Sequence, residues 1–230
     1  AAEWVEKSIQ RFTNADVQQG YGLTETSPIL TTLDADDHRN AIESGDTSIL
    51  RAAGRPLLGI DLKILDDAGN EVPTGEAGEV CVRGPNVTPG YLNRPDENEK
   101  AFKNGWFHTG DVGRVDENGV MFLMDRKKDM IVSGGENIYT SEVEAALYKH
   151  PDVFECAVIG VPDDKFGETL FAVIVTAPGK TLNGEIVIDH CRELIAGYKI
   201  PRKMDFVDAL PKSAMSKILK NELRDIYNKK

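Results

Sequence analysis

Six side chains, spread over most of the chain, are of types that stack on a planar ring or bind anions, cations or paired hydroxyls: Tyr21, Thr24, Glu25, Asp111, Arg126 and Lys217. The carboxylate of Glu25 offers hard oxygen ligands of the kind that Mg²⁺ prefers. The hydroxyl of Thr24 has the size to bond a phosphate oxygen, and the planar guanidinium of Arg126 suits bidentate contacts. Because these residues lie far apart in the sequence, they act together only if the fold gathers them.

Each of these residues lies in a short motif: YGLTE at Tyr21–Glu25, HTGD at His108–Asp111, DRKKDMIVSGGENIYTSEVE at Asp125–Glu144, and PKSAMSK at Pro211–Lys217. In the third motif, Gly134 and Gly135 let a ligand approach the backbone closely, because glycine has no Cβ. Ser141, with Glu144 three residues later, matches a capping box and predicts that a helix begins there.

Every motif also has an ordinary structural interpretation. Thr24-Glu25 is typical of a helix start, and an aspartate after a glycine, such as Asp111, is common in turns. Asp125 and Arg126 fit a surface salt bridge, and Lys217 fits a solvated lysine at the start of a helix. The motifs become specific because all four occur in one chain and in this order.

Together with GEVCVRGPNVTPGYLNRP between the first two, the four motifs resemble those of the adenylate-forming enzymes, which include acyl- and aryl-CoA synthetases. Within that superfamily the chain is most similar to a carboxylic acid–CoA ligase of the fatty-acyl or aryl-acyl kind. The resemblance implies two half-reactions, in which a carboxylate first attacks ATP to give an acyl-adenylate. The thiol of coenzyme A then displaces AMP, so ATP/AMP, Mg²⁺ and coenzyme A are the expected cofactors.

For the nucleotide, the resemblance implies that Tyr21 lies against adenine and that Asp111 binds the ribose hydroxyls. Thr24 contacts the α-phosphate and Glu25 holds Mg²⁺, so that both count as catalytic as well as binding residues. Arg126 resembles a ribose or phosphate contact. Gly22 lies near the floor of the pocket for an uncharged fatty or aromatic acid.

For the second half of the chain, the resemblance implies a mobile domain. Asp125 is the expected hinge, and Gly134 with Gly135 lines the tunnel for the pantetheine arm of coenzyme A. The ammonium of Lys217 bridges the carboxylate and the α-phosphate during adenylation. The family usually has glycine before this lysine, whereas this chain has Ser216, which is tolerated at negative φ and strained at positive φ.

The predicted fold class is α+β. Residues 1–124 are expected to be the C-terminal part of a large AMP-binding domain, remaining as an antiparallel β-subdomain, and residues 125–230 a small α+β lid domain. The apolar patterns and turn signals predict the main elements. These are helices over 1–12, 141–149, 183–196 and 217–227, and strands over 17–21, 60–65, 78–83, 112–115, 120–124, 153–161, 170–176 and 203–207, with 34–46 an exposed loop or short helix.

The composition favours a globular protein, with 40% hydrophobic and 28% charged residues. The net charge of −11 disfavours nucleic acid as a partner. Cys81, Cys156 and Cys191 form no CxxC pair, so neither a disulfide framework nor a zinc site is indicated. The sequence has no apolar run that predicts a transmembrane segment, and it is compatible with a cytoplasmic location and with a homodimer.

Members of the family are much longer than 230 residues, and their Ser/Thr/Gly-rich triphosphate loop is not found in this sequence. The chain is therefore expected to be a fragment that needs a preceding N-terminal part and is inactive alone. Two alternatives stay open. One is a nucleotide-binding or interaction module without catalysis, and the other is an adenylation domain that transfers its acyl group to a carrier protein.

Overall fold

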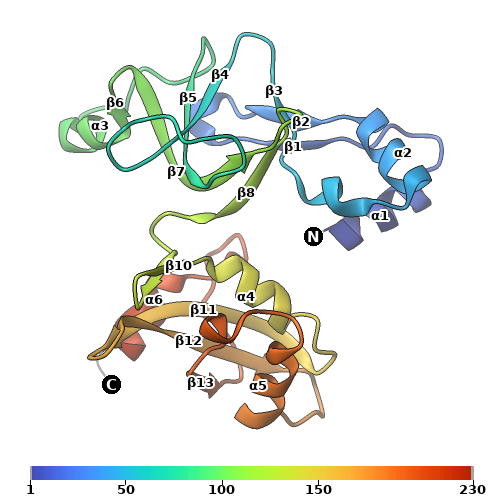
Figure 1. Ribbon diagram of the computed structural model, residues 1–230, viewed down its shortest axis with the longest axis vertical. Helices are drawn as coiled ribbons and strands as arrows, with labels where there is room; N and C mark the ends of the chain where they lie inside the picture. The colour runs from blue at the N-terminus through green and yellow to red at the C-terminus, as the bar shows by residue number, and fades with distance from the viewer. Residues whose placement is uncertain (1, 229–230) are drawn as a thin grey trace. The chain divides into compact units, whose positions relative to one another are not determined.

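The computed structural model describes residues 2–228, with side chains from residue 5 onward, and it forms two compact units, Ala1–Met124 and Asp125–Lys230 (Figure 1). We call them the N-terminal unit and the C-terminal unit. Strand β8 (Met121–Arg126) leads from the first into the second. Helices accompany mainly antiparallel sheets in both units, which confirms the predicted α+β class.

Two sheets form the N-terminal unit. One has the order β1-β2-β3, and the other has the order β4-β5-β7-β6 with β8 paired to β7. Apolar side chains from both sheets, among them Leu30, Val80 and Phe107, share one core. The strands are β1 (Gln19–Tyr21), β2 (Thr31–Leu33), β3 (Arg55–Pro56), β4 (Asp61–Leu65), β5 (Gly78–Arg83), β6 (Phe102–Lys103) and β7 (Trp106–Val115).

The helices of the N-terminal unit lie around these sheets. They are α1 (Ala2–Arg11), α2 (Ala35–Ser44), α3 (Pro95–Ala101) and the 3₁₀ turns η1 (Thr24–Thr26) and η2 (Thr47–Arg51). The acidic segment from residue 34 is a helix rather than a loop because the Asp34 carboxylate caps it, accepting from the Asp37 N–H at 2.9 Å. Helix α3 was not predicted, since none of its residues is buried and its sequence is almost entirely polar.

The C-terminal unit is built on one mixed sheet, in which β12 pairs with β11, with β9 and, in parallel, with β13 (Figure 1). Helices α4 and α5 pack on one face, and helix α6 packs on the other. The strands are β9 (Ile131–Ser133), β10 (Glu136–Ile138), β11 (Val153–Asp163), β12 (Gly167–Thr176) and β13 (Lys203–Phe206). The helices are α4 (Thr140–Leu147), α5 (Gly184–Arg192), the 3₁₀ turn η3 (Gly197–Lys199) and α6 (Lys220–Tyr227).

The predicted capping box at Ser141 is wrong. Helix α4 begins one residue earlier, at Thr140, and the carboxylate that caps it belongs to Asp125, which accepts from the N–H groups of Thr140 and Ser141. The Glu144 side chain instead accepts from the Val158 N–H at 2.8 Å. A local sequence pattern cannot reveal a cap that comes from fifteen residues away.

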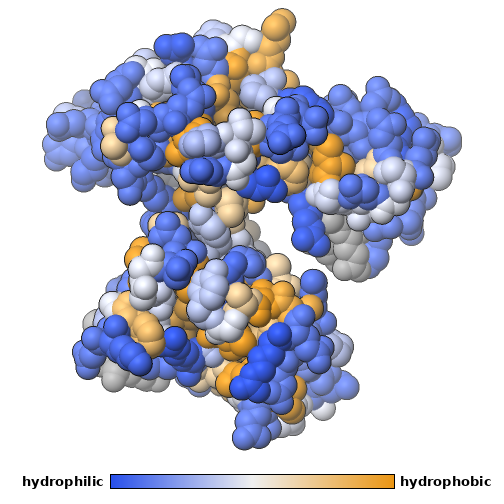
Figure 2. Space-filling view, in the orientation of Figure 1, coloured by the Kyte–Doolittle hydropathy of each residue, from blue (hydrophilic) through white to orange (hydrophobic). Residues whose placement is uncertain are grey.

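Two predicted helix ends also differ. Helix α6 begins at Lys220 rather than at Lys217, and helix α5 ends at Arg192 rather than near Ala196. On the face shown in Figure 2, hydrophilic residues cover most of each unit, while the apolar side chains listed above lie in the cores. Among residues 2–228, no helix combines the length and the apolar character needed to cross a bilayer.

Candidate functional site

Tyr21 and Asp111, which are ninety residues apart in the sequence, meet in the N-terminal unit. Tyr21 ends strand β1, and Asp111 lies in strand β7. The Tyr21 hydroxyl donates to Asp111 Oδ2 at 2.7 Å, and the Asp111 residue is only 7% exposed. The fold therefore joins the first and second motifs into one polar site.

A wide bulge in strand β7 carries Asp111. Glu79 pairs with Val112 and Cys81 pairs with His108, so Thr109, Gly110 and Asp111 together face the single residue Val80 of β5. Bulges of this kind redirect side chains. Side chains satisfy the displaced backbone groups: Thr109 Oγ1 donates to Val80 O at 2.8 Å and accepts from Asp111 N at 3.1 Å, and Glu79 Oε1 accepts from Gly110 N at 3.2 Å. These side-chain hydrogen bonds hold the bulge, and with it Asp111, in one conformation.

Thr24 and Glu25 form the turn η1, directly after β1. Glu25 Oε1 accepts a hydrogen bond from the Tyr91 hydroxyl at 2.9 Å, and burial together with this carboxylate raises the pKa of Tyr91. Within the described part of the chain, Glu25 Oε2 makes no hydrogen bond or ion pair, so one hard oxygen is left for a cation. Thr24 is exposed and therefore accessible to a ligand.

Gly22 allows two backbone segments to approach closely. A Cβ at this position would lie 1.9 Å from Pro28 O, which no side chain can tolerate. The close approach brings the segment after β1 against the segment that leads into β2, where Leu30 N donates to Tyr21 O at 2.7 Å. In this structure Gly22 thus fixes the loop that presents Thr24 and Glu25.

In the C-terminal unit, Asp125 anchors helix α4. Its Oδ2 accepts from the Thr140 hydroxyl at 2.8 Å and from the Ser141 N–H at 3.3 Å, and its Oδ1 accepts from the Arg126 N–H at 2.7 Å. Arg126 also accepts, through its backbone oxygen, from the N–H groups of the following turn. The hinge residue expected from the sequence is therefore tied to the C-terminal unit by its side chain.

Lys220, the first residue of helix α6, is paired and mostly buried rather than solvated. Its side chain is 16% exposed, donates to Thr140 Oγ1 at 2.7 Å and pairs with Glu144 Oε1 at 2.7 Å. Burial raises the pKa of the Glu144 carboxyl, and the ion pair with Lys220 opposes that rise. Helix α6, helix α4 and Asp125 are thereby linked into one network.

Gly134 and Gly135 form the two-residue turn between β9 and β10. Ser133 pairs with Glu136, and the two glycines have φ values of +62° and +88°. Two successive positive φ values define a type I′ turn, which glycine adopts without steric cost. The turn is exposed, and Gly134 N donates to Phe166 O at 2.9 Å, so a bare stretch of backbone is held at the surface.

Lys217 stands on a small hairpin before helix α6. Lys212 and Ile218 pair across it, and Ser213 N donates to Lys217 O at 2.8 Å. The Lys217 residue is exposed, and its ammonium has no hydrogen bond or ion pair with any residue from 5 to 228. Ser216 has a φ of +61°, the conformation in which serine is strained and glycine is not.

The structure thus brings Tyr21 to Asp111 and places Glu25 after the same strand, while Asp125, Arg126, Gly134, Gly135 and Lys217 belong to the C-terminal unit. Their assigned roles stay predictions. Sequence reasoning missed Glu79, Tyr91, Thr140 and the pairing of Lys220 with Glu144. Glu79 and Tyr91 lie in the quoted segment GEVCVRGPNVTPGYLNRP, and Thr140 and Glu144 lie in the third motif, so a place in a quoted motif was the one signal that pointed to them. Lys220 lies outside all the quoted segments.

Comparison with known proteins gives the class. The family model "AMP-binding enzyme" matches residues 1–92, and the model "AMP-binding enzyme C-terminal domain" matches residues 142–217. The chain belongs to the AMP-binding enzymes, the adenylate-forming family that the motifs resemble.

Relatives that the chain matches are named as acid–CoA ligases. The chain is 45% identical over 206 residues to feruloyl-CoA synthase from Amycolatopsis sp., covering 90% of this chain and 40% of the relative. It is 40% identical over 227 residues to long-chain-fatty-acid–CoA ligase from Escherichia coli O6:H1, covering 98% and 37%. The chain therefore spans about 40% of the length of the curated relatives it matches.

Solved structures also resemble this chain. The chain resembles o-succinylbenzoate CoA synthetase from Bacillus subtilis in complex with its acyl-adenylate intermediate, with a TM-score of 0.84 and 40% identity over 96% of this chain and 43% of that chain. It also resembles ATP-bound MatB from Rhodopseudomonas palustris, with a TM-score of 0.85 and 36% identity over 99% and 43%.

Proposed function

We propose that the protein of which this chain is a part is an ATP-dependent carboxylic acid–CoA ligase, which forms an acyl-adenylate and then an acyl-CoA thioester. The observation that carries the proposal is the 2.7 Å contact between the Tyr21 hydroxyl and Asp111 Oδ2. It places an aromatic ring and a buried carboxylate at one site, which is what recognition of a nucleoside requires. The names of the relatives support the same reaction class.

In the N-terminal unit, Asp111 accepts hydrogen bonds from the ribose hydroxyls of ATP or AMP, and Tyr21 lies beside the base. Glu25 Oε2 is a ligand for Mg²⁺, and the Thr24 hydroxyl donates to the α-phosphate. Tyr91 holds the other oxygen of Glu25 and so fixes the direction of the free one. The residues present fit a nucleotide with Mg²⁺, because one carboxylate is committed to hydroxyls and another keeps an oxygen for a cation.

In the C-terminal unit, the Lys217 ammonium offsets the negative charge of the acid and the α-phosphate as they approach. It can do so because the hairpin holds it in solvent without another partner. Arg126 contacts the ribose or a phosphate. The backbone of Gly134 and Gly135 lines the path of the pantetheine arm of coenzyme A, and the unit turns about Asp125 between the two half-reactions.

The acid is a fatty or aromatic carboxylate. The relatives named for ferulate, long-chain fatty acids and 2-succinylbenzoate have similar identity over this chain, between 40% and 45%, so the identities favour none of these acids over the others. A role in fatty acid metabolism follows only if the acid is a fatty acid.

The test uses the full-length protein and a panel of ferulate, long-chain fatty acids and 2-succinylbenzoate. Acid-dependent exchange of pyrophosphate into ATP, followed by thioester formation with coenzyme A, is the expected result. Exchange without any thioester on coenzyme A, but with transfer to a carrier phosphopantetheine, would assign the protein to the carrier-dependent adenylation domains. Nucleotide binding without exchange on any acid would identify a non-catalytic module and overturn the proposal.

A further inference from the structure

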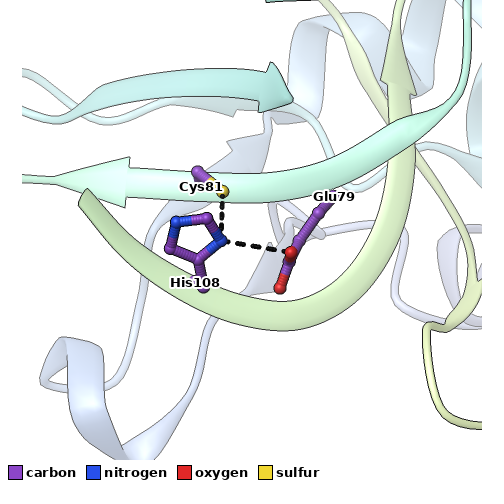
Figure 3. Close-up of side chains that lie close together, drawn as sticks. All are labelled: Glu79, Cys81 and His108. Carbon is purple, nitrogen blue, oxygen red and sulfur yellow. Dashed lines mark hydrogen bonds and ion pairs between the residues drawn. The ribbon is translucent and has the colours of Figure 1, made fainter. Parts of the chain in front are cut away.

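Three potential metal ligands converge between strands β5 and β7. Glu79 and Cys81 are two residues apart on β5 and therefore point to the same face, and His108 on β7 pairs directly with Cys81. Figure 3 shows the three side chains turned toward one another. His108 Nδ1 lies 3.3 Å from Cys81 Sγ and 3.1 Å from Glu79 Oε2, and the ligand atoms of all three residues lie within 4.8 Å of one another. It is the only such group of three found among the described residues.

Both hydrogen-bond contacts of the cluster end on the same nitrogen, His108 Nδ1, so Cys81 and Glu79 share its single proton or lone pair. If His108 Nδ1 carries a proton, it donates to Glu79 and cannot accept the thiol proton of Cys81. If Nδ1 is unprotonated, it can accept from the thiol but then faces an oxygen lone pair of Glu79. A cysteine–histidine–carboxylate relay uses the two ring nitrogens separately, and here Cys81 is 0% exposed, so nucleophilic catalysis is not what this geometry serves.

We propose that Glu79, Cys81 and His108 form a binding site for a borderline-soft divalent cation, Zn²⁺ in the first instance. A single cation accepts a lone pair from the sulfur, the nitrogen and the oxygen at once. Thiolate and carboxylate together carry two negative charges, which balance the charge of Zn²⁺. Three protein ligands of these types leave the fourth tetrahedral position for water.

The two distances from His108 Nδ1 suit such an ion. Tetrahedral Zn²⁺ with ordinary bond lengths places neighbouring ligand atoms about 3.4–3.6 Å apart, so the observed 3.1 and 3.3 Å need to widen by only a few tenths of an ångström. The strand register fixes all three side chains, which limits the entropy lost on binding. The side chains of Glu79 and His108 are 11% and 15% exposed, and they provide the route of entry.

Metal binding is compatible with the bulge that carries Asp111. The ion takes Oε2 of Glu79, whereas Oε1 is the atom that accepts from Gly110 N at 3.2 Å. The metal site and the proposed nucleotide site therefore use different atoms. The test of Zn²⁺ binding and the test of nucleotide binding can therefore succeed or fail independently.

The test titrates the purified, metal-free chain with Zn²⁺ and, separately, with Co²⁺, whose d–d and thiolate charge-transfer absorption reports sulfur ligation. We expect one equivalent to bind and the charge-transfer band to appear. Cys81→Ser should abolish that band and weaken Zn²⁺ binding by roughly 10-fold or more. Mutation of a residue that only hydrogen-bonds to a metal ligand already costs about 10-fold in affinity. Cys191→Ser, at another buried cysteine, is the matched control and should keep both properties.

Circular dichroism and the urea midpoint of each metal-free variant show whether it is folded. If Cys81→Ser does not fold, His108→Asn and Glu79→Gln carry the test, with the expected result a weaker Zn²⁺ affinity and a changed cobalt spectrum. Absence of the charge-transfer band in the folded wild-type chain would overturn the proposal. So would a Zn²⁺ affinity that is the same in the wild type and in the folded variants at all three positions.

Discussion

The N-terminal unit holds Asp111 in a bulge at 7% exposure, with its carboxylate already bonded to Tyr21. The C-terminal unit presents Lys217, Gly134 and Gly135 on exposed turns. Its half-buried polar groups Asp125, Glu144 and Lys220 are linked through the Thr140 hydroxyl and the Lys220–Glu144 ion pair. One unit thus builds its candidate site into the sheet, and the other holds it outside the core.

Because of this difference, substitutions in the two units should affect ligand binding and stability differently. In the N-terminal unit, a change to a site residue also disturbs the sheet around it. In the C-terminal unit, substitution of an exposed turn residue should have little effect on stability. Substitution within the network of Asp125, Glu144 and Lys220 should have a large effect on stability. Groups that must meet a ligand only during part of a cycle are suited to exposed turns, since their removal from the ligand leaves no buried charge unpaired.

The largest effect is expected from Lys217→Ala in the full-length protein. Adenylation should fall roughly 100- to 1,000-fold, as when a preorganised charge-stabilising group is removed, while thioester formation from preformed adenylate and the unfolding midpoint change little. Pre-steady-state measurement of each half-reaction gives the comparison. Lys212→Ala, on the same hairpin, is the control, and an equal loss in both half-reactions would contradict the role of Lys217.

Lys220→Ala should act on stability instead. It leaves Glu144 partly buried without its cation, which is expected to cost roughly 3 kcal/mol in the free energy of unfolding. Urea denaturation of the 230-residue chain measures this cost. A loss no greater than that of Lys217→Ala would remove the contrast between buried network and exposed turn.

Asp111→Asn tests the preformed site. The amide keeps the shape of the carboxylate but loses its charge and one acceptor oxygen, so the affinity of the full-length protein for AMP should fall about 10- to 100-fold. Isothermal titration calorimetry measures it. Tyr21→Phe removes only the hydroxyl and should cost less, and an unchanged affinity in Asp111→Asn would place the nucleotide elsewhere.

Tyr227 gives a pH test of the packing of α6. Its hydroxyl donates to Asp205 Oδ2 at 2.9 Å, and burial, then this carboxylate, raises the pKa of Tyr227 to about 12. A tyrosine in the unfolded chain ionises near 10, so the unfolded state loses its proton first and stability falls as pH rises through roughly 10 to 12.

The stability advantage of the wild type over Tyr227→Phe should therefore shrink by on the order of 1 kcal/mol between roughly pH 9 and 11. Urea midpoints of both proteins across that range provide the measurement. A constant difference would show that the hydroxyl ionises equally in the folded and unfolded chain.

The smallest effect is expected from Ser216→Gly. At a φ of +61°, glycine relieves strain but adds freedom to the unfolded chain, so the net gain is about 0.5 kcal/mol. Chemical denaturation detects it, and adenylation by the full-length protein should stay within about 3-fold of the wild type. A clear rise in adenylation rate would show that serine misplaces Lys217.

The sequence predicted the α+β class and most of the long elements, because alternating apolar residues such as those of β4 and β5 are a local signal. It also supplied the motifs that carry family membership. It did not predict α3, whose residues bury nothing, or the true cap of α4, which comes from Asp125.

The chemistry of the candidate groups was thus set by the sequence alone, since it depends on residue type and on short motifs. Their environments were decided by the tertiary structure. The meeting of Tyr21 with Asp111, the pairing of Glu25 with Tyr91, and the cluster of Glu79, Cys81 and His108 all join residues 27 to 90 positions apart. Strand register and bulges place such side chains together, and these follow from packing across the whole sheet, which no local pattern encodes.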